Sequence, residues 1–139
     1  MALRRDAKIE LLKRAPLFAG CSKSELRALA SSADELDLRE GTVITREGRP
    51  GREFFVLISG TAEVTKKGKE IADLVAGDWF GEIALLTDAP RTATVKATSA
   101  VDVLVITDRR FRNVVETMPS IALKILSSVG ERLARDAHS

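Results

Sequence analysis

The residues best suited to binding chemistry lie between Gly81 and Thr94, in the run Gly-Glu-Ile-Ala-Leu-Leu-Thr-Asp-Ala-Pro-Arg-Thr-Ala-Thr. Gly81 has no Cβ, so the backbone can approach a ligand closely, and the amides of a short helix beginning there would face anionic oxygens. Arg91, held by the stiff Pro90, offers a planar fork of N–H donors that suits a phosphate. Glu82 is an acceptor-only carboxylate that a ribose hydroxyl would satisfy. Together they predict a ligand with one phosphate and one sugar hydroxyl.

The same segment resembles the phosphate-binding cassette of the cyclic nucleotide-binding domain. The motifs that match are Phe-Gly-Glu-Ile-Ala-Leu at residues 80–85 and Pro-Arg-Thr-Ala-Thr at residues 90–94. That domain is shared by catabolite-activator-type regulators, cyclic-nucleotide-dependent kinases and gated channels. The cassette would span residues 80–94, and the resemblance extends over the whole chain.

The resemblance implies a role for each cassette residue. Glu82 would hold the ribose 2′-hydroxyl and Arg91 the cyclic phosphate, with backbone contacts from Gly81 and Ala84 and a hydroxyl and amide from Thr92. The full set expected at the phosphate and ribose is Gly81, Glu82, Ile83, Ala84, Arg91 and Thr92. The alternative is that Glu82 and Arg91 only pair with each other on the surface. Such a pair contributes little and does not require the small and rigid residues around it.

The purine is expected to sit against strand residues and under the last helix. Val64 and Ile71 are the candidates for its apolar wall, with ordinary core packing as the alternative. Arg132 would stack on the base, with Leu133 or Arg135 as alternates. The alternative for Arg132 is an ordinary exposed side chain.

Thr92 bears on the identity of the base. In the family that the cassette resembles, a threonine or serine here can bond the 2-amino group of a guanine, whereas alanine favours adenine. Many bacterial-type domains with Thr or Ser at this position nevertheless bind cAMP. We therefore expect cAMP as the ligand, keep cGMP open, and expect no separate cofactor.

Residues 3–33 predict two helices ahead of the strands. The amphipathic stretch 3–14 carries five basic residues interleaved with two acidic ones, which indicates a solvated face or, alternatively, a docking surface for another subunit or domain. Ser22 and Glu25 form a capping box that starts the second helix. Cys21, just before this cap, is expected to be a small buried residue with no reactive thiolate.

Residues 34–106 change to short strands punctuated by glycine. Phe54 to Ile58 is a continuous apolar run, typical of a strand buried on both sides, whereas residues 47–51 read as a loop. About eight short strands at near-regular spacing predict an antiparallel barrel or jelly roll. The resemblance implies the same fold class, mainly β with flanking α, an eight-stranded antiparallel jelly-roll barrel.

Residues 107–137 predict two further helices, the first beginning at Thr107 or Asp108. The resemblance implies that these are the helices that move on ligand binding. Leu85 and Leu86 would pack against their hinge and link the cassette to them, which does not exclude a place in the core. The apolar stripe predicted for the last helix is Ala122, Ile125, Leu126, Val129 and Leu133.

Composition argues against several function classes. The net charge of +2 over 139 residues is too small to indicate a nucleic-acid-binding face. No apolar run resembles a signal peptide or is long enough to span a bilayer. The single cysteine fits a reducing cytosol, so we expect a cytoplasmic protein. The single histidine, His138, leaves neither a catalytic triad nor a set of metal ligands, so we expect no enzyme and no metal.

We therefore expect one domain, residues 1–139, that binds a 3′,5′-cyclic nucleotide and shifts its hinge and last helix toward a closed arrangement. It looks like a bacterial-type sensor that regulates a protein partner or a fused effector domain. Whether the chain is a full protein or a fragment, and its oligomeric state, stay open. The alternative is a degenerate domain that binds no nucleotide and serves as a protein-interaction module. The intact Glu82 and Arg91 argue against it.

Overall fold

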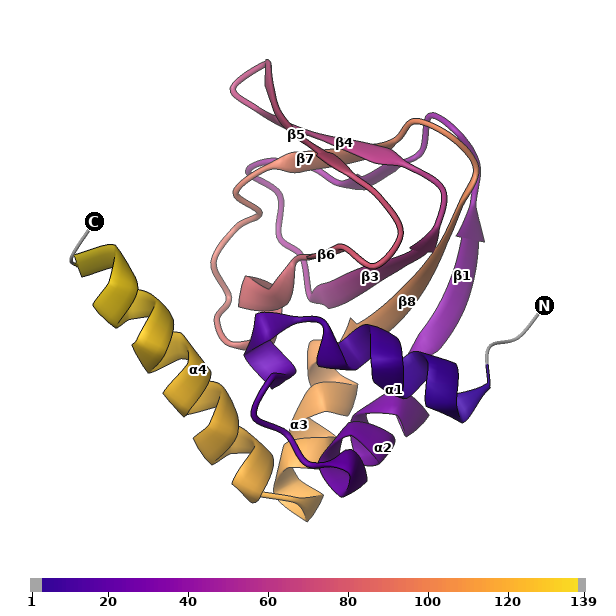
Figure 1. Ribbon diagram of the computed structural model, residues 1–139. Coiled ribbons are helices and arrows are strands. Elements are labelled where there is room, and N and C mark those ends of the chain that lie inside the picture. Colours follow the sequence, from indigo (N-terminus) through magenta and orange to yellow (C-terminus); the bar gives the residue numbers. More distant parts are fainter. Residues whose placement is uncertain (1–3, 138–139) are drawn as a thin grey trace. The chain divides into compact units, whose positions relative to one another are not determined.

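The structure is a computed structural model that describes residues 4–137 (Figure 1). The chain forms two compact units. The β unit comprises Ala33–Asp108, and the helical unit comprises the described residues that precede and follow it. His138 lies outside the described residues. Within residues 4–137, none of the helices is both long and apolar enough to cross a membrane.

The β unit consists of two four-stranded sheets, with the orders β1-β8-β3-β6 and β2-β7-β4-β5. All the strand pairs are antiparallel, which confirms the predicted jelly-roll class. The described strands form two separate ladders, with no closed barrel among them. The strands are β1 Asp34–Leu38, β2 Val43–Thr45, β3 Glu53–Ser59, β4 Ala62–Lys66, β5 Lys69–Leu74, β6 Trp79–Phe80, β7 Thr94–Ala97 and β8 Val101–Thr107.

Apolar side chains from both sheets form the core of the β unit. The run Phe54 to Leu57 in β3 is 5% exposed or less at each residue, as its continuous apolar character predicts. The rings of Phe55 and Phe80 stack with their centroids 4.9 Å apart, and this contact anchors the strand from which the cassette emerges. Phe55, Leu57 and Phe80 belong to one core cluster, whose other buried members are Ala62, Val95, Ala97, Val101, Val103 and Val105.

The helical unit contains helices from both ends of the chain. The predicted capping box is present: Ser22 Oγ accepts a hydrogen bond from Glu25 N at 3.2 Å, and Ser22 N donates to Glu25 Oε1 at 2.7 Å. Cys21 is half-buried, and burial raises the pKa of its thiol to about 11, which agrees with an unreactive residue. The helices are α1 Arg5–Lys13, η1 Pro16–Phe18, α2 Lys23–Ser31, α3 Asp108–Thr117 and α4 Ser120–Ala137.

Glu25 also joins α2 to α4. Glu25 is 2% exposed, and its carboxylate accepts hydrogen bonds from Lys124 Nζ and, at 2.5 Å, from Ser120 Oγ. Lys124, Ser120 and the Ser22 backbone together lower the pKa of Glu25 to about 2, against the opposing effect of burial. A buried charge is thus fully partnered inside the helical unit.

The apolar stripe predicted for α4 is wrong in part. Ile121 and Ile125 are the buried residues, at 0% and 4% exposure, whereas Leu126 and Leu133 are 68% and 65% exposed. Ala122 is exposed as well. Two stripes, offset by one residue, fit the same helical period, so the sequence alone does not decide which one packs. The contact of α4 with η1 selects the stripe that contains Ile121.

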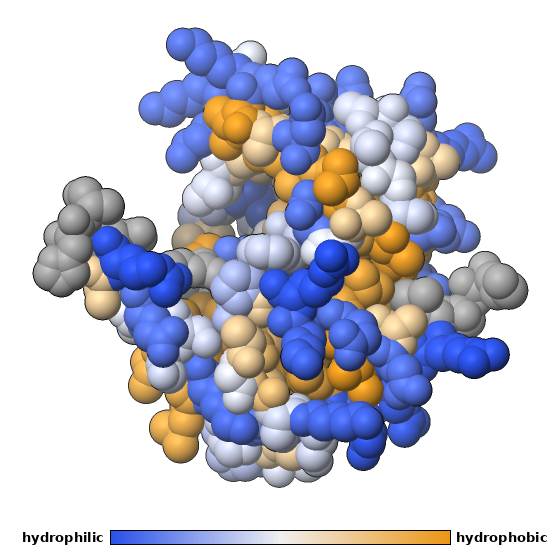
Figure 2. All heavy atoms as spheres, in the orientation of Figure 1, coloured by the Kyte–Doolittle hydropathy of each residue, from blue (hydrophilic) through white to orange (hydrophobic). Residues whose placement is uncertain are grey.

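The two units carry opposite net charges. Over the sequence, the helical unit has thirteen Lys and Arg against six Asp and Glu, a net charge of +7. The β unit has nine against fourteen, a net charge of −5. Figure 2 shows hydrophilic residues over much of the face drawn, with hydrophobic residues gathered between them. The chain's overall +2 therefore conceals a strong separation of charge.

Candidate functional site

The segment 80–94 leaves β6 through a left-handed turn at Gly81. Gly81 has φ 81° and precedes the short helix η2, Glu82–Leu85. A Cβ at this position would lie 2.7 Å from the carbonyl oxygen of Glu53 and 2.7 Å from Arg91 Nη1. Both the backbone angle and the available space therefore require glycine. Within η2, Ala84 and Leu85 are buried, whereas Ile83 is 46% exposed and Leu86, which follows η2, is 40% exposed.

The backbone of Arg91 is joined to the loop between β2 and β3. Arg91 N donates to the carbonyl oxygen of Arg49 at 2.9 Å, and Gly48 N donates to the carbonyl oxygen of Arg91 at 2.8 Å. Pro90 restricts the chain just before this pair of bonds. The backbone of Arg91 is thus fixed by hydrogen bonds to a loop about 40 residues earlier in the sequence.

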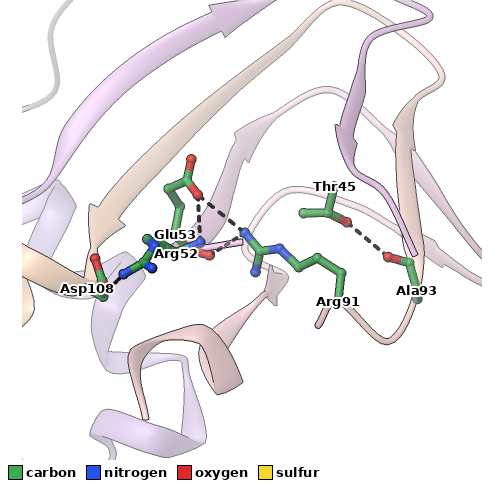
Figure 3. A network of polar contacts seen from close by, with 6 residues as sticks. All are labelled: Thr45, Arg52, Glu53, Arg91, Ala93 and Asp108. Carbon is green, nitrogen blue, oxygen red and sulfur yellow. Dashed lines mark hydrogen bonds and ion pairs between the residues drawn. The ribbon is translucent and has the colours of Figure 1, made fainter. Parts of the chain in front are cut away.

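The side chain of Arg91 is only 9% exposed. Nη2 donates to the carbonyl oxygen of Glu53 at 2.9 Å and lies 3.6 Å from Glu53 Oε1, as Figure 3 shows. The guanidinium carbon also lies 5.9 Å from the centroid of the Phe55 ring. Burial lowers the pKa of Arg91, and the Glu53 carboxylate opposes that effect. An arginine stays charged under both influences, so a buried cation lies at this site.

The alternative in which Arg91 and Glu82 form an exposed surface pair does not describe this geometry. Arg91 is buried, and its ion pair is with Glu53. Glu82 is half-buried at the start of η2.

Gly51 is a site residue that the sequence reasoning missed. A Cβ at Gly51 would lie 1.9 Å from Arg91 Nε and 2.4 Å from its Cζ, so any side chain here would displace the guanidinium. Glu53 was missed as well. From the sequence, residues 47–51 were interpreted only as a loop, and no local spacing relates that loop to Arg91. A glycine that ends a loop just before a buried strand is the one signal the sequence offers.

Polar bonds hold the strand that follows Arg91. Thr45 is buried in β2, and its Oγ1 donates to the carbonyl oxygen of Ala93 at 3.2 Å. Glu47 N donates to Thr94 Oγ1 at 3.0 Å. On the other side, Arg52 Nη1 lies 3.3 Å from Asp108 Oδ2, while the Arg91 guanidinium points toward Glu53 (Figure 3). Two adjacent residues, Arg52 just before β3 and Glu53 at its first position, therefore contact Asp108 and Arg91 respectively.

Two adjoining cavities in the β unit meet at Arg91. The larger, about 290 Å³, is close to the lower end of the range of small-molecule sites, roughly 300–1,000 Å³. It is lined by apolar residues of β4, β5 and β6, including Val64 and Ile71, and by Gly81, Glu82, Arg91 and Thr92. The smaller, about 110 Å³, is lined by Gly81, Glu82, Ile83, Ala84, Ala89, Pro90, Arg91 and Thr92.

The structure therefore brings together the residues expected at phosphate and ribose. It also places Val64 and Ile71 on the wall of the same larger cavity. Ile71 is 57% exposed, so it does not belong to the core, and Val64 is half-buried against the core. The functional roles of all these residues stay predictions.

The remaining candidates lie in the helical unit. Leu133 and Arg135 are exposed on α4, and the side chain of Arg132 lies outside the described residues. Their predicted contacts with the base stay predictions. So does the link that Leu85 and Leu86 were expected to form with the C-terminal helices.

This arrangement can bind an anion that carries an apolar group. The guanidinium supplies a charged donor that is largely shielded from solvent, where charge-assisted hydrogen bonds are stronger than in water. A half-buried carboxylate at Glu82 supplies an acceptor beside it. Apolar side chains across the larger cavity suit a flat heterocycle.

The chain matches known proteins on both sequence and structure. Residues 35–118 match the family model of the cyclic nucleotide-binding domain. The chain is 40% identical over 146 aligned residues to the cAMP-dependent protein kinase regulatory subunit of Mycosarcoma maydis, an alignment that covers 97% of this chain and 26% of the relative. The chain spans about a quarter of the length of the curated relatives it matches.

Two solved structures resemble the fold. The N-terminal domain of a transcriptional regulator from Streptomyces coelicolor A3(2) superposes with a TM-score of 0.85 at 28% identity, covering 93% of this chain and 96% of that one. The cAMP-bound PfPKA-R structure superposes with a TM-score of 0.70 at 28% identity, covering 91% of this chain and 47% of that one.

Proposed function

Because this chain belongs to the cyclic nucleotide-binding domain family, we propose that it binds a 3′,5′-cyclic nucleotide at Arg91, with cAMP as the preferred ligand. A regulatory subunit of cAMP-dependent kinase at 40% identity and a cAMP-bound structural neighbour support the choice of cAMP. cGMP is the second candidate, since Thr92 at the cavity offers a hydroxyl to a guanine amino group. The proposal needs no metal or other cofactor.

One observation carries the proposal. The Arg91 side chain is 9% exposed, is fixed by main-chain and aromatic contacts, and lines both cavities. Burying a guanidinium costs solvation free energy that an anionic ligand would offset. A cyclic phosphate, which carries one negative charge, would pair with this one guanidinium. Glu82 would accept from the ribose 2′-hydroxyl, and Val64 and Ile71 would contact the purine.

We propose that the domain acts by binding alone and catalyses no reaction. The nucleotide would favour one arrangement of α3 and α4 over another and so regulate a protein partner or an attached effector domain. A ligand shifts such an equilibrium only by its difference in affinity for the two arrangements. A reducing compartment such as the cytoplasm would suit the single cysteine.

Arg91→Ala tests the proposal. After bound nucleotide has been stripped, calorimetric titration of the wild-type protein with cAMP and then cGMP is expected to show binding of at least one. The variant should lose about 2 kcal/mol or more of binding free energy, roughly thirtyfold in affinity, because a charged partner of a buried anion is removed.

Arg49→Ala is the matched control. Arg49 is exposed in the loop that contacts Arg91 and takes part there through its backbone carbonyl, so its side chain can be removed without a change in affinity. Circular dichroism should show both variants folded. Unchanged affinity in a folded Arg91→Ala protein would refute the assignment, and absence of binding by the wild type would favour the protein-interaction module.

A further inference from the structure

The guanidinium of Arg91 has two sides with different surroundings. Nη2 faces Glu53, with the carbonyl oxygen at 2.9 Å and the carboxylate Oε1 at 3.6 Å. Nη1 lies close to Gly81, since a Cβ added to this glycine would be only 2.7 Å from Nη1. Gly81 and Glu82 line both cavities. An anion bound there would therefore share one cation with the carboxylate of Glu53.

The Glu53 carboxylate is not what fixes the position of Arg91. The main-chain carbonyl of Glu53 makes the shorter contact with Nη2, and Gly51 and Phe55 confine the rest of the guanidinium. At 3.6 Å the carboxylate lies within ion-pair range but beyond a good hydrogen bond. Its own orientation is set locally, because Glu53 Oε1 accepts from Arg52 N at 2.9 Å. What the carboxylate contributes is mainly negative charge.

We propose that Glu53 sets the affinity of the site for its nucleotide, by neutralising part of the charge of Arg91 and by repelling the phosphate. This inference rests on the proposed function, since it concerns the same ligand at the same arginine. Glu53 lies at the first position of β3 and is 43% exposed, so solvent weakens the repulsion without abolishing it. Glu53 thus keeps the domain responsive to higher nucleotide concentrations than Arg91 alone would require.

The experiment compares wild-type protein with Glu53→Gln, in calorimetric titrations with cAMP. Glutamine keeps the shape and the acceptor for Arg52 N but removes the charge. We expect it to bind cAMP roughly three- to tenfold more tightly at about 0.05 M salt, with a smaller gain at about 0.5 M salt. Affinity for adenosine, which has no phosphate, should not change. Glu53→Asp, which keeps the charge, should bind cAMP much as the wild type does.

Glu40→Gln is the matched control for total charge. Glu40 is exposed in the turn that follows β1, and its substitution removes the same unit of negative charge. A gain in Glu40→Gln as large as in Glu53→Gln would overturn the inference, because the effect would then belong to the net charge. Equal or weaker cAMP binding by Glu53→Gln, beside a wild type that binds, would also overturn it and leave the proposed function intact. Failure of both proteins to bind cAMP would overturn both proposals together.

Discussion

Two glycines leave the space that the guanidinium of Arg91 occupies. Gly51 and Gly81 lie on either side of the guanidinium, and a Cβ on either would come within 2.7 Å of its atoms. They differ in backbone conformation, because only Gly81 has a positive φ. A substitution at Gly51 therefore acts through space alone and reports on the arginine.

Gly51→Ala is expected to weaken cAMP binding by about tenfold or more, because Arg91 must leave its position to make room for the new methyl group. The fold should lose little stability, since Gly51 has an ordinary backbone angle and the arginine is the far end of a flexible side chain. Calorimetric titration and thermal unfolding measure the two effects. Gly20→Ala, where the new methyl would meet only an ordinary contact with Lys124 at 3.8 Å, is the matched control. Full affinity in Gly51→Ala would show that Arg91 binds from another position.

The sequence predicted the residues of this site that are close together in the chain. Gly81, Glu82 and Arg91 were recognisable from their types and spacing. Gly51 and Glu53 were not, because each contacts Arg91 across 38 or more positions through strand pairing and loop closure. Local patterns carry no information on such contacts.

At the scale of the secondary-structure elements, Glu25 makes the best-defined connection between two helices, α2 and α4. It closes the capping box of α2 and also binds Ser120 and Lys124 of α4. The capping box was predictable, because both partners lie within one helical turn. The partners on α4 were not, being 95 and 99 positions away. Contacts between residues far apart in the sequence also explain the error on α4. The helical period was predicted correctly, but which face of the helix is buried depends on such contacts and was predicted wrongly in part.

The lowered pKa of Glu25 predicts how the free energy of unfolding depends on pH, and the Glu25→Gln variant tests this prediction. The pKa of Glu25 is lowered from 4.5 to about 2 by its hydrogen-bond partners, so the unfolded state takes up its proton at a higher pH than the folded state. The contribution of Glu25 is therefore fully present above the unfolded value and is lost as the pH falls from about 4.5 through about 2.

Chemical unfolding between neutral pH and about pH 2 measures this contribution. The wild type should exceed Glu25→Gln by a constant free energy at neutral pH, and the difference should shrink across the acidic range. Glu10→Gln, which alters an exposed carboxylate of α1, should follow the wild type throughout. A difference between wild type and Glu25→Gln that does not change with pH would mean that the buried carboxylate makes no charge-dependent contribution.

At the scale of the whole molecule, the chain has two units of opposite net charge, and both cavities at Arg91 lie within the β unit. Hydrogen exchange can follow the two units separately. At a free cAMP concentration of about 100 times Kd, opening of the β unit should cost about 2.7 kcal/mol more than without ligand. If the nucleotide also regulates the helices, amides of α3 and α4 should change their protection at the same time.

The Arg91→Ala protein at the same cAMP concentration is the control. With a roughly thirtyfold weaker affinity, its β unit should gain only about 0.9 kcal/mol or less, and the change in α3 and α4 should shrink in the same way. Added protection confined to residues 33–108 would contradict the proposed transmission to the helices while leaving nucleotide binding in place. Only the fold class and the strand content at this scale were predictable from the sequence. The separation of charge between the units becomes visible only when the chain is divided as the structure divides it.

The loop between β2 and β3 also matters for anyone who would build a fluorescent reporter from this domain. Exposed loops of small and polar residues are usually the positions where a second protein can be inserted. Residues 46–52 fit that description, yet their backbone makes both main-chain bonds to Arg91. The turn at Lys67 and Gly68 contacts that loop through the hydrogen bond from Lys67 N to Glu47 Oε1 at 2.9 Å, and not through a main-chain bond to Arg91. A fluorescent protein is therefore better inserted in that turn, because the main-chain hydrogen bonds of Gly48 and Arg49 to Arg91 then stay intact.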